Sequence, residues 1–156
     1  MAIHSNSGGW KTAAVLAGRL IFAAVFIIAL SFKLMDIDGT ASLIAAAGFP
    51  MPKVLAWLAA AFEFALVVCL LTGAYFSEAT LLAAAYVLFL AFAFHGPALW
   101  AGKQEEFAFF VDHFTFIAGL LFAAVHGPGH VLALRACFIG SKHPASNSAT
   151  TELERS

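Results

Sequence analysis

The chain has 156 residues, of which 62% are hydrophobic and 11% are charged, and its net charge is −1. A water-soluble domain of this length could not bury so large an apolar fraction, so lipid must be the solvent for most of the chain. The near-neutral charge gives no indication of a nucleic-acid partner. The two cysteines, Cys69 and Cys137, form no CxxC pair, which excludes a disulfide framework and a dithiol redox relay.

Four apolar segments are each long enough to cross a hydrocarbon core, which takes about 20 residues of helix. They are predicted at 12–32, 53–73, 78–97 and 108–128. The first segment contains Arg19 and no small-residue cleavage site follows it, so we expect a transmembrane helix there rather than a signal peptide. Between the first two segments, Asp36 and Asp38 precede a short Ala-rich stretch that Gly48 and Pro50 can end, which predicts a short helix at the membrane interface.

These elements predict an all-α fold, a transmembrane four-helix bundle with a short interfacial helix between the first two helices. The expected organisation is an N-terminal polar segment at 1–11, the four-helix domain at 12–136 and a flexible C-terminal tail at 137–156. An even number of crossings places both termini on one face of the membrane. Lysine and arginine are slightly more frequent on that face, which favours cytoplasmic termini.

Two ionisable side chains lie well inside the apolar segments, Arg19 in the first and Glu63 in the second. At about 1.5 Å of rise per residue, both lie at a similar depth from the same boundary. An unpaired charge near the bilayer centre costs at least about 2.5–3.5 kcal/mol, so we expect a buried Arg19–Glu63 ion pair between adjacent antiparallel helices. In one interpretation the pair is purely structural and fixes the helix register. In the other, Glu63 accepts a proton or binds a polar ligand, and both interpretations stay open.

A second polar group gathers at the ends of three predicted helices. Lys33 ends the first, His95 ends the third, and Asp112 and His113 lie in the first turns of the fourth. Alternating helices bring all four to one face of the membrane, where they could bind an anion, a metal or a quinone carbonyl. The alternative is that they only cap helices and reach toward water.

The histidines also raise the question of metal and haem. Two stacked haems on His113 and His126 are disfavoured because the third predicted helix offers only His95, and a single haem between His95 and His113 is disfavoured as well. A metal site of His95, His113 and Asp112 has suitable ligand types but no diagnostic spacing, so no metal site is predicted. The sequence contains no flavin, nicotinamide or iron–sulfur motif.

The order of these pieces resembles the DoxX family of small four-helix membrane proteins over about residues 15–135. The resemblance rests on GRLIFAAVFIIALSFKLMD, which contains Arg19 and Lys33, and on GTASLIAAAGFPMP. It also rests on EFALVVCLLTG, which begins at Glu63, on FLAFAFH and on GLLFAAVHGPG. One departure is that such proteins often open the last helix with Lys-Asn, where this chain has Asp112-His113.

The resemblance implies membrane redox work, since family members include a subunit of a thiosulfate:quinone oxidoreductase. The expected function is therefore a small subunit of the bacterial inner membrane that supports quinone-linked electron transfer. In this interpretation Lys33, His95 and His113 offer hydrogen bonds to a quinone carbonyl, and Asp112 orients His113 or takes up a proton. A protein partner carries the redox cofactor. The alternative is a non-catalytic anchor or assembly subunit of a larger membrane complex, and a homo-oligomer also stays open.

Overall fold

The structure, a computed structural model of the chain, describes residues 9–134, and within them every regular element is a helix. The predicted all-α bundle, with a short helix between the first two long helices, is confirmed. The predicted tail at 137–156 and most of the segment at 1–11 lie outside the described residues. The helices are α1 (Gly9–Met35), α2 (Ile37–Ala46), α3 (Pro52–Thr72), α4 (Phe76–His95), the 3-10 helix η1 (Pro97–Leu99) and α5 (Gln104–His126).

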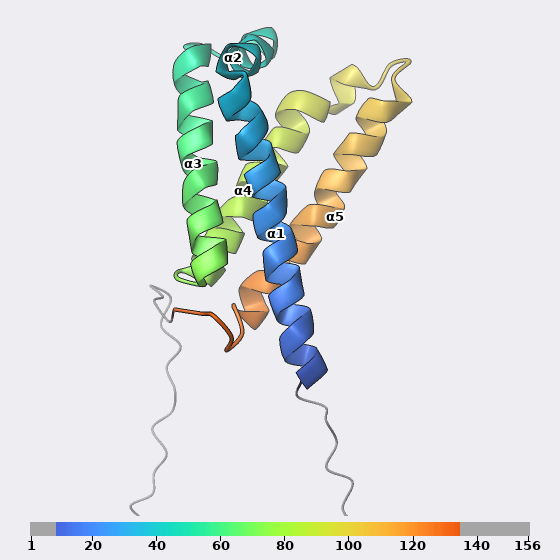
Figure 1. Cartoon of the computed structure of the whole chain (residues 1–156). Coiled ribbons are helices and arrows are strands. Elements are labelled where there is room, and N and C mark those ends of the chain that lie inside the picture. The colour runs from blue at the N-terminus through green and yellow to red at the C-terminus, as the bar shows by residue number, and fades with distance from the viewer. Residues whose placement is uncertain (1–8, 135–156) are drawn as a thin grey trace, which may run out of the picture.

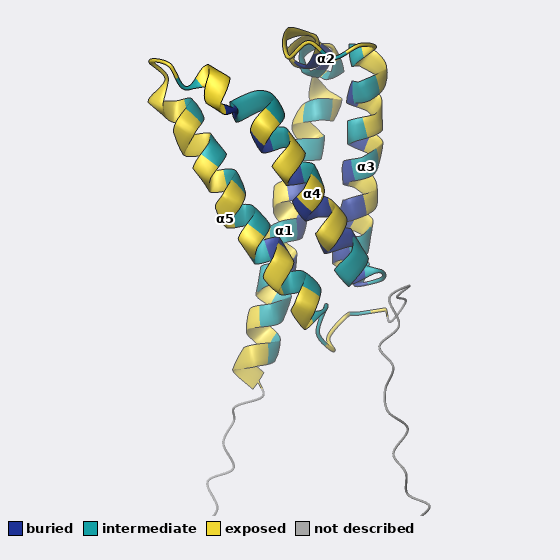
Figure 2. Ribbon diagram, turned by 180° about the vertical axis from the view of Figure 1, so that it is seen from behind, coloured by how far each residue is buried: buried dark blue, intermediate teal, exposed yellow. Residues whose placement is uncertain are grey.

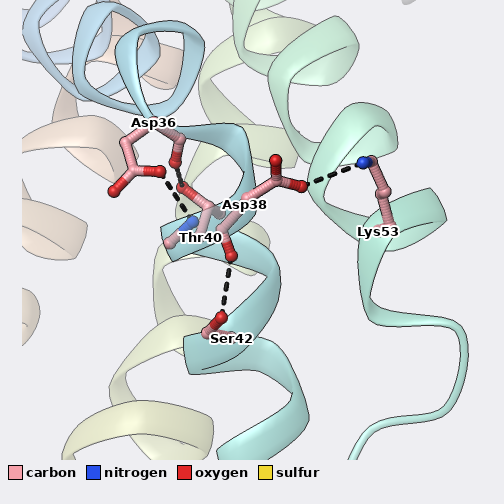
Figure 3. Close-up of polar contacts among 6 residues, drawn as sticks. Asp36, Asp38, Thr40, Ser42 and Lys53 are labelled. Atoms are coloured by element: carbon pink, nitrogen blue, oxygen red, sulfur yellow. Dashed lines mark hydrogen bonds and ion pairs between the residues drawn. The ribbon is translucent and has the colours of Figure 1, made fainter.

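Local sequence explains where α2 begins and how it is attached to α3. The Asp36 carboxylate accepts a hydrogen bond from the backbone N–H of Gly39 at 2.8 Å, which caps the first turn of α2 (Figure 3). The Asp38 carboxylate pairs with the Lys53 ammonium of α3 at 2.9 Å. Pro52 occupies the first turn of α3, where its missing N–H costs no helical hydrogen bond. These contacts hold α2 across the end of the bundle.

The long helices form two pairs (Figure 1). α1 packs along α3, α4 packs along α5, and α2 lies across one end against α3. The pairs meet at the opposite end, where the apolar core gathers around Phe26, Leu70, Val87 and Leu120. Small residues let the backbones approach closely there. At Gly119 of α5 an added Cβ would lie 3.0 Å from the ring of Phe22.

Much of the remaining apolar surface is exposed along the outer faces of the helices (Figure 2). By length and composition, four segments can cross a membrane: α1, α3, α4 together with η1, and α5. Exposed leucine, valine and phenylalanine side chains on such helices are what lipid contact requires. The chain is therefore a multi-pass membrane protein.

The arrangement predicts which segments share a membrane face. Single cysteines replacing Ala46 and Lys103, in a background without Cys69 and Cys137, should react with an impermeant thiol reagent from one side. A cysteine replacing Lys11 should react from the other side. All three residues are exposed, so access of the reagent to the side chain does not limit the reaction. Labelling of positions 46 and 103 from opposite sides would contradict the four-crossing topology.

Candidate functional site

A cleft of about 1440 Å³ lies between the two helix pairs. The pairs separate toward the end where α2 lies (Figure 1). All five α-helices contribute residues to the walls of the cleft. The walls are mostly aliphatic and aromatic. The volume exceeds the roughly 300–1,000 Å³ of most enclosed ligand sites, because this cleft is open at its mouth.

Part of the cleft is lined by exposed apolar side chains of the membrane-spanning helices. Phe32 of α1, Leu58 of α3, and Leu82 and Phe89 of α4 line it and are each at least half exposed. Side chains at this depth face lipid rather than water. A lipid-soluble molecule could therefore enter the cleft sideways from the bilayer.

One polar group in the cleft wall connects three helices. The Lys33 ammonium of α1 lies 2.8 Å from Oε1 of Glu63 in α3, and the Tyr86 hydroxyl of α4 donates to the same oxygen at 2.9 Å. Lys33 and Tyr86 line the cleft, whereas the Glu63 side chain is only 1% exposed behind them. Its second oxygen, Oε2, is buried without a hydrogen-bond partner among residues 9–134. The group holds one buried carboxylate with one cation and one hydroxyl.

A second polar group lies on the wall formed by α4 and α5. Nδ1 of His95 is 2.7 Å from a carboxylate oxygen of Glu106, and the ring of His95 contacts the ring of His113 at a centroid distance of 5.2 Å. Nδ1 of His113 is 2.6 Å from the backbone oxygen of Phe109, one turn earlier. The Trp100 indole donates to the carbonyl of His95 at 2.8 Å, which fixes the end of α4. Both imidazoles are therefore held through Nδ1, and both line the cleft.

The structure brings together three of the four residues predicted at this face: Lys33, His95 and His113 all line one cleft. Asp112 does not line it and is exposed. The prediction that Asp112 orients His113 is wrong, because the Phe109 carbonyl holds that ring. Neighbouring residues on a helix point about 100° apart, so Asp112 faces away from the side that carries His113.

The predicted Arg19–Glu63 ion pair is also wrong. The Arg19 guanidinium, only 2% exposed, donates to the backbone oxygens of Pro128 at 3.0 Å and Leu132 at 3.1 Å. The segment after α5 also bonds the end of α3, through Leu134 N–H to the oxygen of Thr72 at 2.8 Å. Arg19 therefore lies level with the end of α3 rather than with Glu63, because α1 extends past α3 at that end (Figure 1).

Arg19 has a structural role that follows from the bilayer. Residues 127–134 leave helical geometry, so their carbonyls lack helical partners at the end of the bundle. The C-terminal ends of α3 and α5, which carry partial negative charge, also converge here. The guanidinium donates hydrogen bonds to the free carbonyls and places a positive charge near the negative helix ends. This explains why Arg19 is buried although no carboxylate lies within 4.0 Å of it among the described residues.

Sequence reasoning missed Tyr86 and Glu106. Tyr86 is embedded in an apolar run, and only its hydroxyl in the middle of a spanning helix marked it for attention. Glu106 resembles any acidic residue in the first turn of a helix, where carboxylates are common. Glu106 precedes His113 by seven residues, which is two helical turns and places both on one face of α5. This spacing could have identified Glu106 as a candidate.

The described part of the chain contains no group of three histidine, cysteine, aspartate or glutamate side chains placed to hold a metal ion. The His95–Glu106–His113 group offers a ligand hydrogen-bonding groups from α4 and α5. Most of the other residues that line the cleft are apolar.

Comparison with known proteins identifies the family. The model of the DoxX family matches residues 14–96, which include most of α1 and all of α2, α3 and α4. The matched range therefore contains Arg19, Lys33, Glu63, Tyr86 and His95. α5, with Glu106 and His113, follows the matched range. No curated protein and no solved structure matches the chain. Because the match covers more than half of the chain, the protein belongs to the DoxX family.

Proposed function

We propose that this protein binds a quinone in the cleft between its helix pairs and supports quinone-linked electron transfer as a small subunit of the bacterial inner membrane. The observation that carries the proposal is the convergence of Lys33, His95 and His113 on one apolar cleft that opens among the spanning helices. The redox cofactor that exchanges electrons with the quinone belongs, in this proposal, to a partner subunit. We also propose that both termini lie in the cytoplasm.

The shape of the cleft suits an amphipathic ring with an apolar tail. The polar side chains lie on the inner walls, whereas Leu58, Leu82 and Phe89 are exposed at the mouth. A ligand with its ring among the polar groups could leave its tail in lipid. Such a division between a few placed polar groups and an apolar wall is typical of small-molecule sites.

The charges of the site suit a neutral ring with two oxygens. The ammonium of Lys33 is paired with Glu63, and Nδ1 of His95 contacts the carboxylate of Glu106. A neutral ligand can hydrogen-bond to these groups without loss of either contact. Lys33 keeps donor capacity for a ligand oxygen, because an ammonium has three N–H bonds.

The test is quinone binding to the purified protein in lipid nanodiscs, titrated with decylubiquinone and followed by tryptophan fluorescence. Trp100 lies against His95, so a quinone in the cleft should quench its emission. Replacing Lys33 with Met and Glu63 with Leu together removes the ammonium without leaving a buried carboxylate unpaired. This double variant should bind the quinone roughly ten- to a hundred-fold more weakly, the effect of one charge-assisted hydrogen bond.

The control is His126→Ala. His126 bonds a backbone oxygen one turn earlier, as His113 does, but it lies at the other end of α5 and does not line the cleft. The affinity of the His126→Ala variant for quinone should equal that of the unchanged protein. If no quinone binds, or if the Lys33→Met/Glu63→Leu variant binds as tightly as the His126 variant, the quinone proposal fails and a non-catalytic anchor replaces it.

A further inference from the structure

The hydrogen-bonding direction of the two histidines carries information about the redox form of the ligand. The backbone oxygen of Phe109 can only accept a hydrogen bond, so Nδ1 of His113 must carry the proton and donate at 2.6 Å. The ionised carboxylate of Glu106 can likewise only accept, so Nδ1 of His95 donates to it at 2.7 Å. In the neutral imidazole, the proton on Nδ1 leaves a lone pair on Nε2.

Both rings therefore offer the cleft a hydrogen-bond acceptor. His95 and His113 line the cleft and contact each other, and Nε2 of neither ring has a hydrogen-bond partner among residues 9–134. A quinone carbonyl is itself only an acceptor and cannot bond to these atoms. A quinol hydroxyl is a donor and can.

Lys33 does not reverse this preference. Its ammonium can donate to a carbonyl oxygen or to a hydroxyl oxygen, so it serves the quinone and the quinol alike. The Tyr86 hydroxyl donates to Glu63 Oε1, so its proton is already engaged. The discrimination between the two forms comes from the histidines.

We infer that the cleft binds the dihydroxy form of its ligand, a quinol, more tightly than the quinone form, with Nε2 of His95 and of His113 as acceptors for its hydroxyl protons. This inference rests on the proposed function, because it requires that the cleft take a quinone-type ligand. Glu106 is a positioning residue in this inference. It holds Nδ1–H of His95 and thereby keeps Nε2 of that ring free to accept.

The preference has a measurable consequence for the bound pair. A site that binds the quinol more tightly makes the bound quinone easier to reduce, so its midpoint potential rises. For a two-electron couple, a tenfold preference corresponds to a rise of about 30 mV. Two neutral hydrogen bonds present only for the quinol should give a preference of roughly tenfold to a hundredfold.

The experiment measures the affinity of decylubiquinone and of decylubiquinol for the protein in nanodiscs, without oxygen and at pH 8, where imidazole is ordinarily neutral. We expect tighter binding of the quinol. His113→Phe and His95→Phe keep a ring but remove the acceptor, so each should lower the affinity for the quinol roughly three- to tenfold and leave that for the quinone unchanged. His126→Phe, at a histidine with the same Nδ1 contact but outside the cleft, should change neither.

The outcomes separate the inference from the proposed function. Equal affinities, or tighter binding of the quinone, would overturn the inference while the cleft remains a quinone site. Binding of neither form would overturn both. Redox titration of quinone bound to the unchanged protein gives a reading that needs no variant: a midpoint potential at or below that of the free couple would also overturn the inference.

Discussion

Replacing Lys33 with Met is expected to destabilise the protein by about 3–5 kcal/mol, because it leaves the buried carboxylate of Glu63 without its cation. The Glu63 side chain is 1% exposed, and after the substitution the Tyr86 hydroxyl would be its one remaining hydrogen-bond partner among residues 9–134. The measurement is the unfolding transition in detergent, together with the amount of protein that accumulates in the membrane. The double variant Lys33→Met/Glu63→Leu should regain most of the loss, because an apolar pair replaces the ion pair.

The matched control is the exposed pair between Lys53 and Asp38 at the start of α3. These side chains are 65% and 77% exposed, and Lys53→Met should cost only about 0–1 kcal/mol. If Lys33→Met is no more destabilising than Lys53→Met, the Lys33–Glu63 pair does not stabilise the fold. If the double variant is less stable than Lys33→Met alone, the buried charges are not what limits stability.

The second large effect is expected for Arg19→Met. Arg19 makes two hydrogen bonds from a charged donor, each worth about 1.5–3 kcal/mol, and its loss would leave the oxygens of Pro128 and Leu132 without their donor. We expect destabilisation of about 3–5 kcal/mol, with early release of the segment that follows α5. Hydrogen exchange at the Leu134 amide, now bonded to Thr72, should accelerate.

Arg19→Lys is the conservative comparison. A single ammonium lacks the fork of the guanidinium and cannot reproduce both bonds, so the loss should be partial. Arg19→Met combined with Lys33→Met should lose the sum of the two single effects, because the two polar groups share no partner. Strong coupling between them, or unchanged exchange at Leu134 in Arg19→Met, would contradict the assignment of Arg19 to the segment after α5.

The architecture was predictable because lipid imposes a simple rule. Segments of about 20 apolar residues must be helices, and Asp36, Gly48 and Pro50 mark the short helix between the first two. The depth of individual side chains was not predictable. α1 starts at Gly9 and extends past α3, and this offset places Lys33 rather than Arg19 at Glu63.

The candidate site was predictable in part for the same reason. Helix ends place Lys33, His95 and His113 at one face without knowledge of packing. Which atoms meet depends on helix rotation, which the nearly uniform hydrophobicity of α4 does not reveal. The contacts of His95 with Glu106, and of Tyr86 with Glu63, therefore became visible only in three dimensions.

The most direct test of a quinone site in the cleft is photo-crosslinking with an azido-quinone in membranes that contain the protein, followed by mass spectrometry of the modified peptides. The account predicts adducts on cleft residues of different helices, such as Phe32, Leu58 and Phe89, which excess decylubiquinone suppresses. Lys33→Met/Glu63→Leu should reduce these adducts and His126→Ala should not. Adducts confined to residues outside the cleft, or adducts that excess quinone does not suppress, would contradict the account.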